Sequence, residues 1–152
     1  LFACAYDINE RHVKYFELKK LSDEEMTDAV LASAAIPHVY DPVEIEGHKF
    51  ADGGINDPSY GVKNSDVTPL SPLQDEGYDA IIVIHLREQE TLDIDHIGPT
   101  RLVHIYPSKP LEQIKGSGTM NFTRSAIRER FAMGYADMYI ALGKLLMSII
   151  KE

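Results

Sequence analysis

The run YDAIIVIHL, residues 78–86, is the feature that most limits how this chain can fold. Its centre holds four consecutive branched aliphatic residues, Ile81, Ile82, Val83 and Ile84. A strand with one face in water alternates apolar and polar residues. An uninterrupted apolar run is instead typical of a strand buried on both faces, as in a parallel sheet covered by helices. The apolar run RLVHIYPS, residues 101–108, repeats the pattern. We therefore expect two strands of a mainly parallel sheet.

The C-terminal segment predicts one long helix over residues 122–150, because its apolar residues recur every three or four positions. This stripe consists of Ile127, Phe131, Tyr135, Met138, Leu142, Leu145 and Ile149. We expect Tyr135, Met138 and the nearby Tyr139 to lie in the core. Strands that alternate with helices predict an α/β fold, here part of a three-layer α/β/α sandwich with a mainly parallel sheet.

The N-terminal half predicts two pairs of strands and one helix. Residues 1–8 are an apolar run and residues 12–18 an alternating one, separated by a polar turn, and we expect them to form a hairpin. Ser22 and Glu25 form the capping-box pattern S-x-x-E, which predicts a helix over residues 23–35 that stops at Pro37. Glu46-Gly47 lies between two extended runs and predicts a second hairpin. Residues 56–77 are rich in Pro, Ser, Asn, Asp and Gly, and they predict a long loop.

Composition excludes several classes of protein. The chain of 152 residues carries a formal net charge of −9, so a nucleic-acid partner and electrostatic docking on anionic lipid are both disfavoured. Its single cysteine, Cys4, rules out a disulfide framework and a cysteine-rich metal site, and it favours a reducing compartment such as the cytoplasm. No apolar run reaches membrane-spanning length. The chain starts at Leu1 without an initiator Met, which we interpret as the interior of a longer protein.

Asp52 is the first candidate for chemistry. It stands directly before Gly53 and Gly54 in the stretch HKFADGGINDP, residues 48–58. An acid at a strand end can direct its carboxylate into a cleft, and the two glycines allow a sharp turn and leave room for a substrate. Alternatively, the aspartate caps its own backbone in a tight turn. The spacing alone favours the turn.

A wider stretch, LASAAIPHVYDPVEIEGHKFADGGI, resembles the patatin-like phospholipase family. The family pattern is Ala-Ser, a small residue and Pro, then an aromatic-Pro-Val run, a variable hairpin, and Asp-Gly-Gly or Asp-Gly-Ala. The matching residues are Ala32, Ser33, Pro37, Tyr40, Pro42, Val43, Asp52, Gly53 and Gly54. The resemblance continues more loosely through residues 78–86 and into the C-terminal helix, so we expect it to cover the whole chain.

The resemblance implies lipid acyl hydrolysis by a serine–aspartate dyad. In patatin-like enzymes a serine within G-x-S-x-G attacks a lipid ester, and the aspartate of the Asp-Gly-Gly motif accepts its proton. By this carry-over Asp52 is the general base, and Gly53, Gly54 and Pro37 belong to the motif that shapes the substrate pocket. The expected substrate is a lipid or another acyl ester, and no cofactor or metal is implied.

The sequence departs from the family in one decisive respect. G-x-S-x-G is absent from the 152 residues, as is the glycine-rich oxyanion loop, and in the family both precede Asp-Gly-Gly. We therefore interpret residues 1–152 as the C-terminal half of one patatin-like domain. Its expected partners are the nucleophile-bearing N-terminal half or, across an unpaired sheet edge, further copies of the chain. A non-catalytic binding or association segment is the alternative. The family's Asn-x-Pro has two counterparts after Gly54: Asn56-Asp57-Pro58, and later Asn64 with Pro69.

The remaining polar residues carry weaker predictions. His48 lies four positions before Asp52, and we expect a surface histidine rather than a metal ligand. His85 ends the apolar run, and either a packed histidine or a residue at the rim of the cleft is consistent with that position. Arg124, Arg128 and Arg130 are expected on a solvated helix face, although they could also meet phosphate headgroups.

Overall fold

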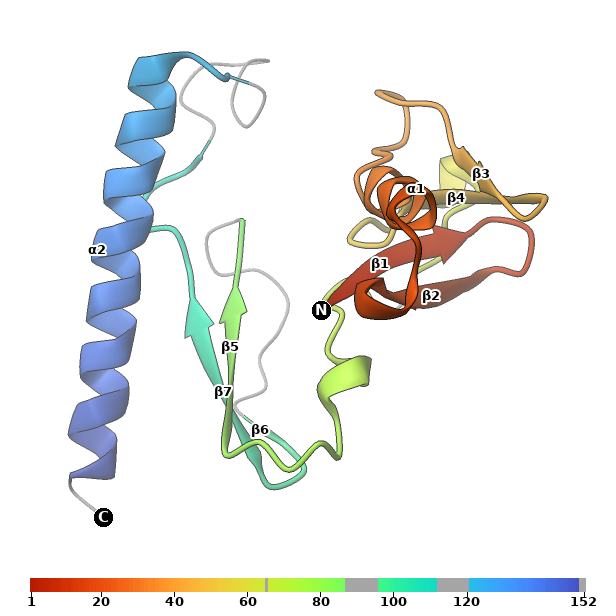
Figure 1. Cartoon of the computed structure of the whole chain (residues 1–152). Helices are drawn as coiled ribbons and strands as arrows, with labels where there is room; N and C mark the ends of the chain where they lie inside the picture. Colours follow the sequence, from red (N-terminus) through yellow and green to blue (C-terminus); the bar gives the residue numbers. More distant parts are fainter. Residues whose placement is uncertain (65, 87–95, 112–120, 151–152) are drawn as a thin grey trace. The chain divides into compact units, whose positions relative to one another are not determined.

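The structure is a computed structural model and describes residues 1–64, 66–86, 96–111 and 121–150. The chain forms two compact units, Leu1–Gln74 and Asp75–Glu152. Figure 1 labels the helices and strands of both units, and each unit is described by itself below.

The first unit contains a four-stranded antiparallel sheet in the order β2-β1-β4-β3. Its strands are β1 (Phe2–Asp7), β2 (His12–Glu17), β3 (Val43–Ile45) and β4 (His48–Asp52). Both predicted hairpins are confirmed, and β1 pairs with β4 to join them. Glu46 and Gly47 connect β3 to β4 with φ angles of 53° and 81°. Positive φ at both central residues is what the two-residue turn of a twisted hairpin requires.

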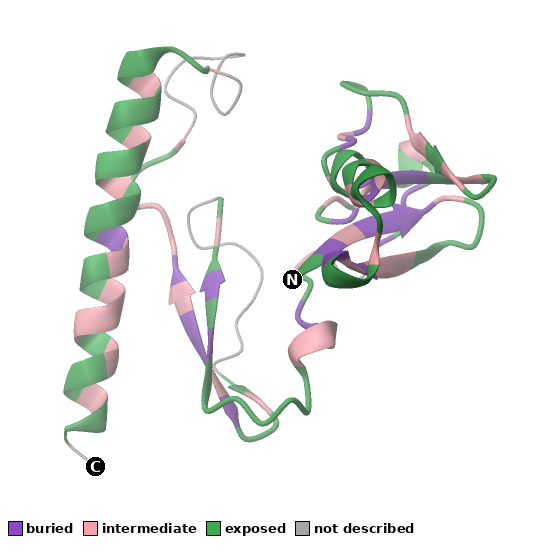
Figure 2. Ribbon diagram, viewed as in Figure 1, coloured by how far each residue is buried: buried purple, intermediate pink, exposed green. Residues whose placement is uncertain are grey.

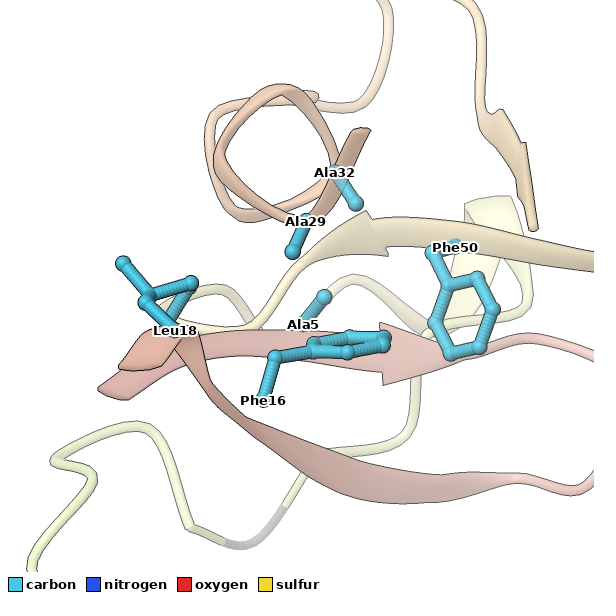
Figure 3. Packing of buried hydrophobic residues seen from close by; sticks show 7 residues of the cluster. Ala5, Phe16, Leu18, Ala29, Ala32 and Phe50 are labelled. Carbon is cyan, nitrogen blue, oxygen red and sulfur yellow. The ribbon is translucent and has the colours of Figure 1, made fainter. Parts of the chain in front are cut away.

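Helix α1 (Asp23–Ser33) packs on one face of this sheet. The predicted capping box is present, because Ser22 accepts from the Glu25 backbone N–H and the Glu25 side chain accepts from the Ser22 backbone N–H. Figure 3 shows Ala29 and Ala32 of the helix directed at Ala5, Phe16 and Phe50 of the sheet. Alanines at the contact let the helix approach the strands closely, and the two phenylalanine rings meet edge to face at 5.5 Å.

The loop that follows β4 covers part of the opposite face of the sheet. A second apolar cluster consists of Tyr6, Ala51 and Val62, with Ile8, Val13 and Tyr60 packed against it. The predicted long loop is confirmed, and it contains two short 3-10 turns, η2 (Pro58–Tyr60) and η3 (Ser71–Leu73). The sheet is therefore covered on both faces within the first unit, by a helix on one side and by a loop on the other.

The second unit contains a three-stranded sheet in the order β5-β7-β6. Its elements are β5 (Ala80–Ile84), β6 (His96–Ile97), β7 (Thr100–Ile105) and the long helix α2 (Arg124–Ile149). β5 and β7 are parallel, as their sequences predict, and β6 adds to β7 antiparallel. The fold is α/β, but the mainly parallel sheet that we expected is not what the structure shows. Among the described strands the only parallel pair is β5 with β7.

Burial of β5 also differs from the prediction. Ile81 and Val83 are buried, whereas Ile82 and Ile84 are 46% and 66% exposed. The register places Ile82 and Ile84 on the same face as Arg101 of β7, whose guanidinium donates to Ser148 of α2 at 2.8 Å. The helix thus lies on that face but packs against β7. An unbroken apolar run in the sequence therefore does not ensure that both faces of the strand are covered, because the cover must come from other elements.

The long helix is confirmed, but its predicted core stripe is wrong at the aromatic positions and also at Ile127 and Ile149, which are exposed. Phe131, Tyr135 and Tyr139 are 79%, 72% and 74% exposed. Figure 2 shows α2 almost entirely exposed or intermediate. The buried residue of this helix is Asp137. The Asp137 carboxylate accepts the Ser108 backbone N–H at 3.0 Å, after the end of β7. Apolar residues lie nearly all round this helix, so periodicity could not select the face that packs.

Candidate active site

Asp52 is the last residue of β4. Its backbone contacts bring the segment after α1, which carries the Pro part of the sequence motif, next to the Asp-Gly-Gly part. Its backbone N–H donates to the carbonyl oxygen of Ala35 at 3.0 Å. The segment after α1, which includes the buried Pro37, therefore runs along the edge of β4 beyond the end of β3. Ala5 of β1 lies opposite Asp52 in register, which places the aspartate on the sheet face that α1 covers.

The Asp52 carboxylate is half-buried and is held at one oxygen. Its Oδ1 accepts the Gly54 backbone N–H at 2.7 Å. Burial raises the pKa of Asp52 above its ordinary value, and the bond from Gly54, which stabilises the charged form, offsets only part of that rise. Within the described residues no hydrogen bond reaches the second oxygen, Oδ2. A carboxylate of raised basicity with one oxygen held and the other unengaged can accept a proton from a neighbouring hydroxyl.

A side chain at Gly53 and a side chain at Gly54 would be disfavoured for different structural reasons. A Cβ at Gly53 would lie 2.5 Å from Cys4 Sγ and 2.7 Å from the Cys4 carbonyl oxygen, so the chain after β4 passes too close to β1 for any side chain. A Cβ at Gly54 would lie 3.2 Å from Oδ1 of Asp52 itself. The motif thus combines a close backbone approach at Gly53 with room beside Oδ1 of Asp52 at Gly54.

A network of hydrogen-bonded polar side chains lies next to the Asp-Gly-Gly motif, and the sequence analysis did not predict it. Asn64 is buried, and its side-chain amide donates to the Gly53 carbonyl oxygen at 2.6 Å. Its own oxygen accepts the Asp66 backbone N–H at 2.8 Å. The Asp66 carboxylate accepts the hydroxyl of Tyr15 and, at 2.8 Å, the hydroxyl of Ser71. These residues come from a turn-rich stretch in which an asparagine is unremarkable, so their role depends on long-range contacts.

Cys4 lies beside this group without the properties of a nucleophile. Burial raises the pKa of its thiol to about 11, with smaller contributions from the negative charges of Asp66 and Asp52. The thiolate is the nucleophilic form, and near neutral pH it is scarce at such a pKa. Burial and the bond to Asp66 likewise raise the pKa of Tyr15.

The histidines that the sequence singled out lie away from Asp52 or belong to the second unit. His48 does not pair with Asp52; its Nδ1 lies 2.8 Å from the buried Asp7 carboxylate. His85 is half-buried in the second unit, with Nε2 at 2.9 Å from Nδ1 of His104 and its ring stacked on Tyr106 at 4.2 Å. It is a packed histidine, as one of the two interpretations expects.

The described residues offer neither a metal site of acidic, His or Cys side chains nor a membrane-spanning helix. Across residues 1–64, 66–86, 96–111 and 121–150, no group of three or more His, Cys, Asp or Glu side chains is arranged to hold a metal ion. Over the same part of the chain, no helix combines the length and hydropathy needed to cross a membrane.

The geometry defines a β-strand end that presents a basic carboxylate beside a glycine turn. Comparison with known families gives this arrangement a context: residues 2–59 match the family model described as patatin-like phospholipase. The match spans β1 to β4 and α1, includes Asp52, Gly53 and Gly54, and ends within η2. It lies in the N-terminal part of the chain, so the looser resemblance that we expected through β5 and α2 rests on the sequence pattern alone. No curated protein matches the chain.

Proposed function

We propose that this chain supplies the general base of a lipid acyl hydrolase, and that Asp52 is that base. The observation that carries the proposal is the position of Asp52 within the matched segment, at a strand end, half-buried and with one oxygen that no described residue engages. Burial supplies the basicity that an exposed carboxylate lacks.

In the proposed reaction a serine hydroxyl donates its proton to Oδ2 of Asp52 while its oxygen attacks the ester carbonyl. The acyl–oxygen bond of the substrate then breaks, the leaving alcohol takes up the proton, and an acyl-serine remains. A water molecule, deprotonated by the same carboxylate, releases the fatty acid and regenerates the serine. Neither step calls for a metal or an organic cofactor.

The nucleophilic serine lies outside these 152 residues in this proposal, because none of their serines stands in G-x-S-x-G. Ser71 is no replacement, since its hydroxyl donates to Asp66 rather than to Asp52. A serine-bearing half of the domain is therefore the partner that the chain needs, and residues 1–152 act as the C-terminal half.

The test is Asp52→Asn in the protein that carries both halves. Asparagine keeps the size of the side chain and its acceptor oxygen for Gly54, but it cannot take the serine proton. We expect esterase activity to fall by roughly 10³- to 10⁴-fold with unchanged folding, as when other hydrolase dyads and triads lose a member. The exposed Asp41→Asn is the matched control and should keep full activity. Wild-type turnover by Asp52→Asn would reduce Asp52 to a turn residue.

A non-catalytic binding segment is the second candidate. The bond from the Gly54 N–H to Asp52 favours it, because an aspartate that accepts an N–H two residues ahead forms an ordinary turn. The same experiment distinguishes the two candidates. Replacement of an aspartate that only forms a turn changes stability and leaves the rate of ester hydrolysis unchanged.

A further inference from the structure

The peptide group between Gly53 and Gly54 is hydrogen-bonded at both of its ends. Its oxygen, the Gly53 carbonyl, accepts from the Asn64 side-chain amide at 2.6 Å. Its N–H, on Gly54, donates to Oδ1 of Asp52 at 2.7 Å. Carbonyl and N–H belong to one planar unit, so fixing the oxygen also fixes the direction of the N–H.

Asn64 is itself rigidly placed. It is 3% exposed, and its oxygen accepts the Asp66 backbone N–H at 2.8 Å. Asp66 in turn is tied to β2 through the Tyr15 hydroxyl and to η3 through Ser71. The loop that carries Asn64 is thus anchored to the same sheet whose strand β4 carries Asp52.

A peptide between two glycines needs such a restraint. Without side chains, its plane can rotate at low cost, and rotation would turn the Gly54 N–H away from Asp52. The bond from Asn64 opposes that rotation. Donation to the carbonyl also polarises the peptide and strengthens its N–H as a donor, since linked hydrogen bonds reinforce one another.

We propose that Asn64 is a positioning residue for Asp52: it fixes the Gly53–Gly54 peptide, whose N–H holds Oδ1 and leaves Oδ2 directed toward the reacting hydroxyl. The role in catalysis rests on the function proposed above, whereas the positioning itself is a property of the 152-residue chain. The plain alternative is that Asn64 only stabilises its loop. In that case its loss would lower stability without changing how Asp52 titrates.

The first experiment follows the Asp52 carboxyl carbon by NMR during a pH titration of the 152-residue chain. Asn64→Ala and Asn64→Ser remove the donor to the Gly53 carbonyl. The bond from Gly54 then weakens, the charged carboxylate loses support, and the pKa of Asp52 rises above its wild-type value. Asn56→Ala is the matched control, an exposed asparagine two residues beyond Gly54, and it should leave the titration unchanged. An Asp52 titration identical in wild type and in a folded Asn64 variant overturns the proposal.

A second measurement needs no variant and covers the case in which the Asn64 variants do not fold. In the wild-type chain, the Asn64 side-chain amide should show slow hydrogen exchange and a coupling across the hydrogen bond to the Gly53 carbonyl carbon. An amide that exchanges at the rate of an exposed asparagine, with no such coupling, excludes the restraint.

The third measurement uses the protein that carries both halves. Asn64→Ala should lower kcat by roughly 10- to 100-fold, the scale of a small displacement of a catalytic group, with little change in KM. The acid limb of its pH profile should move to higher pH, in step with Asp52. Two failures are distinguishable here. If Asp52→Asn keeps full activity, the proposed function fails while the NMR result stands. If Asn64→Ala keeps the wild-type rate and pH profile, the positioning role fails while Asp52 remains the base.

Discussion

Gly53 and Gly54 are neighbours in sequence, but a methyl group added at each would meet different atoms. At Gly53 it would collide with the backbone of Cys4, which cannot move without displacing β1. We expect Gly53→Ala to destabilise the first unit by about 1–3 kcal/mol or more, the cost of overpacking a tight site. Gly54→Ala should cost less, because its contact is the end of a side chain, Oδ1 of Asp52 at 3.2 Å, rather than backbone. Urea unfolding followed by circular dichroism compares the two, and equal losses would contradict this account.

Asp7 is the buried carboxylate whose titration should govern acid stability. Burial acts to raise its pKa, but bonds from the Glu10 and Asn9 backbone N–H groups and from His48 outweigh burial, so the pKa of Asp7 is lowered overall. A lowered carboxylate pKa contributes stability that is present above the unfolded value, near 4, and is lost as the pH falls through the folded value.

We therefore expect the free energy of unfolding to fall as the pH drops below about 4, and Asp7→Asn to flatten that decline. At neutral pH, Asp7→Ala should cost about 1–3 kcal/mol, because the bonds that two backbone N–H groups and His48 make to this charged carboxylate are lost. Denaturant unfolding at a series of pH values measures both effects, with Asp41→Asn as an exposed control. A wild-type slope in Asp7→Asn would place the acid-sensitive group elsewhere.

At this scale the sequence singled out Asp52 as a candidate base only through the resemblance of a wider stretch to a family motif, because the local spacing of an acid before two glycines by itself favours a turn. The sequence could not identify the network of polar side chains next to the motif. Tyr15 and Asp66 lie 51 positions apart, and Asn64 meets Gly53 only after the intervening loop has turned back on the sheet. Such roles depend on long-range contacts, which no local spacing encodes.

Among the elements, α1 gives the clearest test of helix capping and helix propensity. Ser22→Ala removes the cap that accepts the Glu25 N–H and should cost about 1 kcal/mol. The matched control is Thr27→Ala inside the same helix, where the hydroxyl bonds back to the Asp23 carbonyl at 2.8 Å. Alanine is the better helix former there, so that change should be nearly neutral or slightly stabilising. Native-state hydrogen exchange of the α1 amides reports both, and a larger loss in Thr27→Ala would refute the cap argument.

The elements also show where sequence reasoning stops. Both hairpins, the capped helix, the parallel pair β5–β7 and the long helix follow from turn chemistry, caps and apolar periodicity. The mainly parallel sheet did not follow, because apolar content cannot reveal which strand pairs with which. β1 and β4 lie about 45 residues apart in the chain and pair antiparallel, and their register is set by the packing of Ala5 and Phe50 beneath α1. The two-residue strand β6 is too short to carry a pattern.

Across the whole molecule, the two units differ in how their apolar side chains are covered. In the first unit both faces of the sheet carry a packed cluster. The first unit also exposes some large apolar side chains, such as Leu31 and Tyr40, but in the second unit many large apolar side chains of β5 and α2 are more than 40% exposed. They include Ile82, Ile84, Phe131, Tyr135, Tyr139, Ile140, Leu146 and Met147. Exposed apolar surface on this scale is uncommon in a monomer and marks a surface that associates.

We therefore expect the isolated chain to self-associate through its second unit. Light scattering should give a mass above the 17.1 kDa of one chain, increasing with concentration. Phe131→Glu combined with Tyr135→Glu places two charges on the exposed side of α2, where desolvating them in an interface is costly, and should shift the population toward monomer. Lys144→Glu, also exposed on α2, changes charge without removing apolar area and should have little effect. A monodisperse monomer of the wild-type chain, with one cooperative unfolding transition, would show that these side chains need no partner. It would also remove the main physical reason to regard the chain as half of a larger domain.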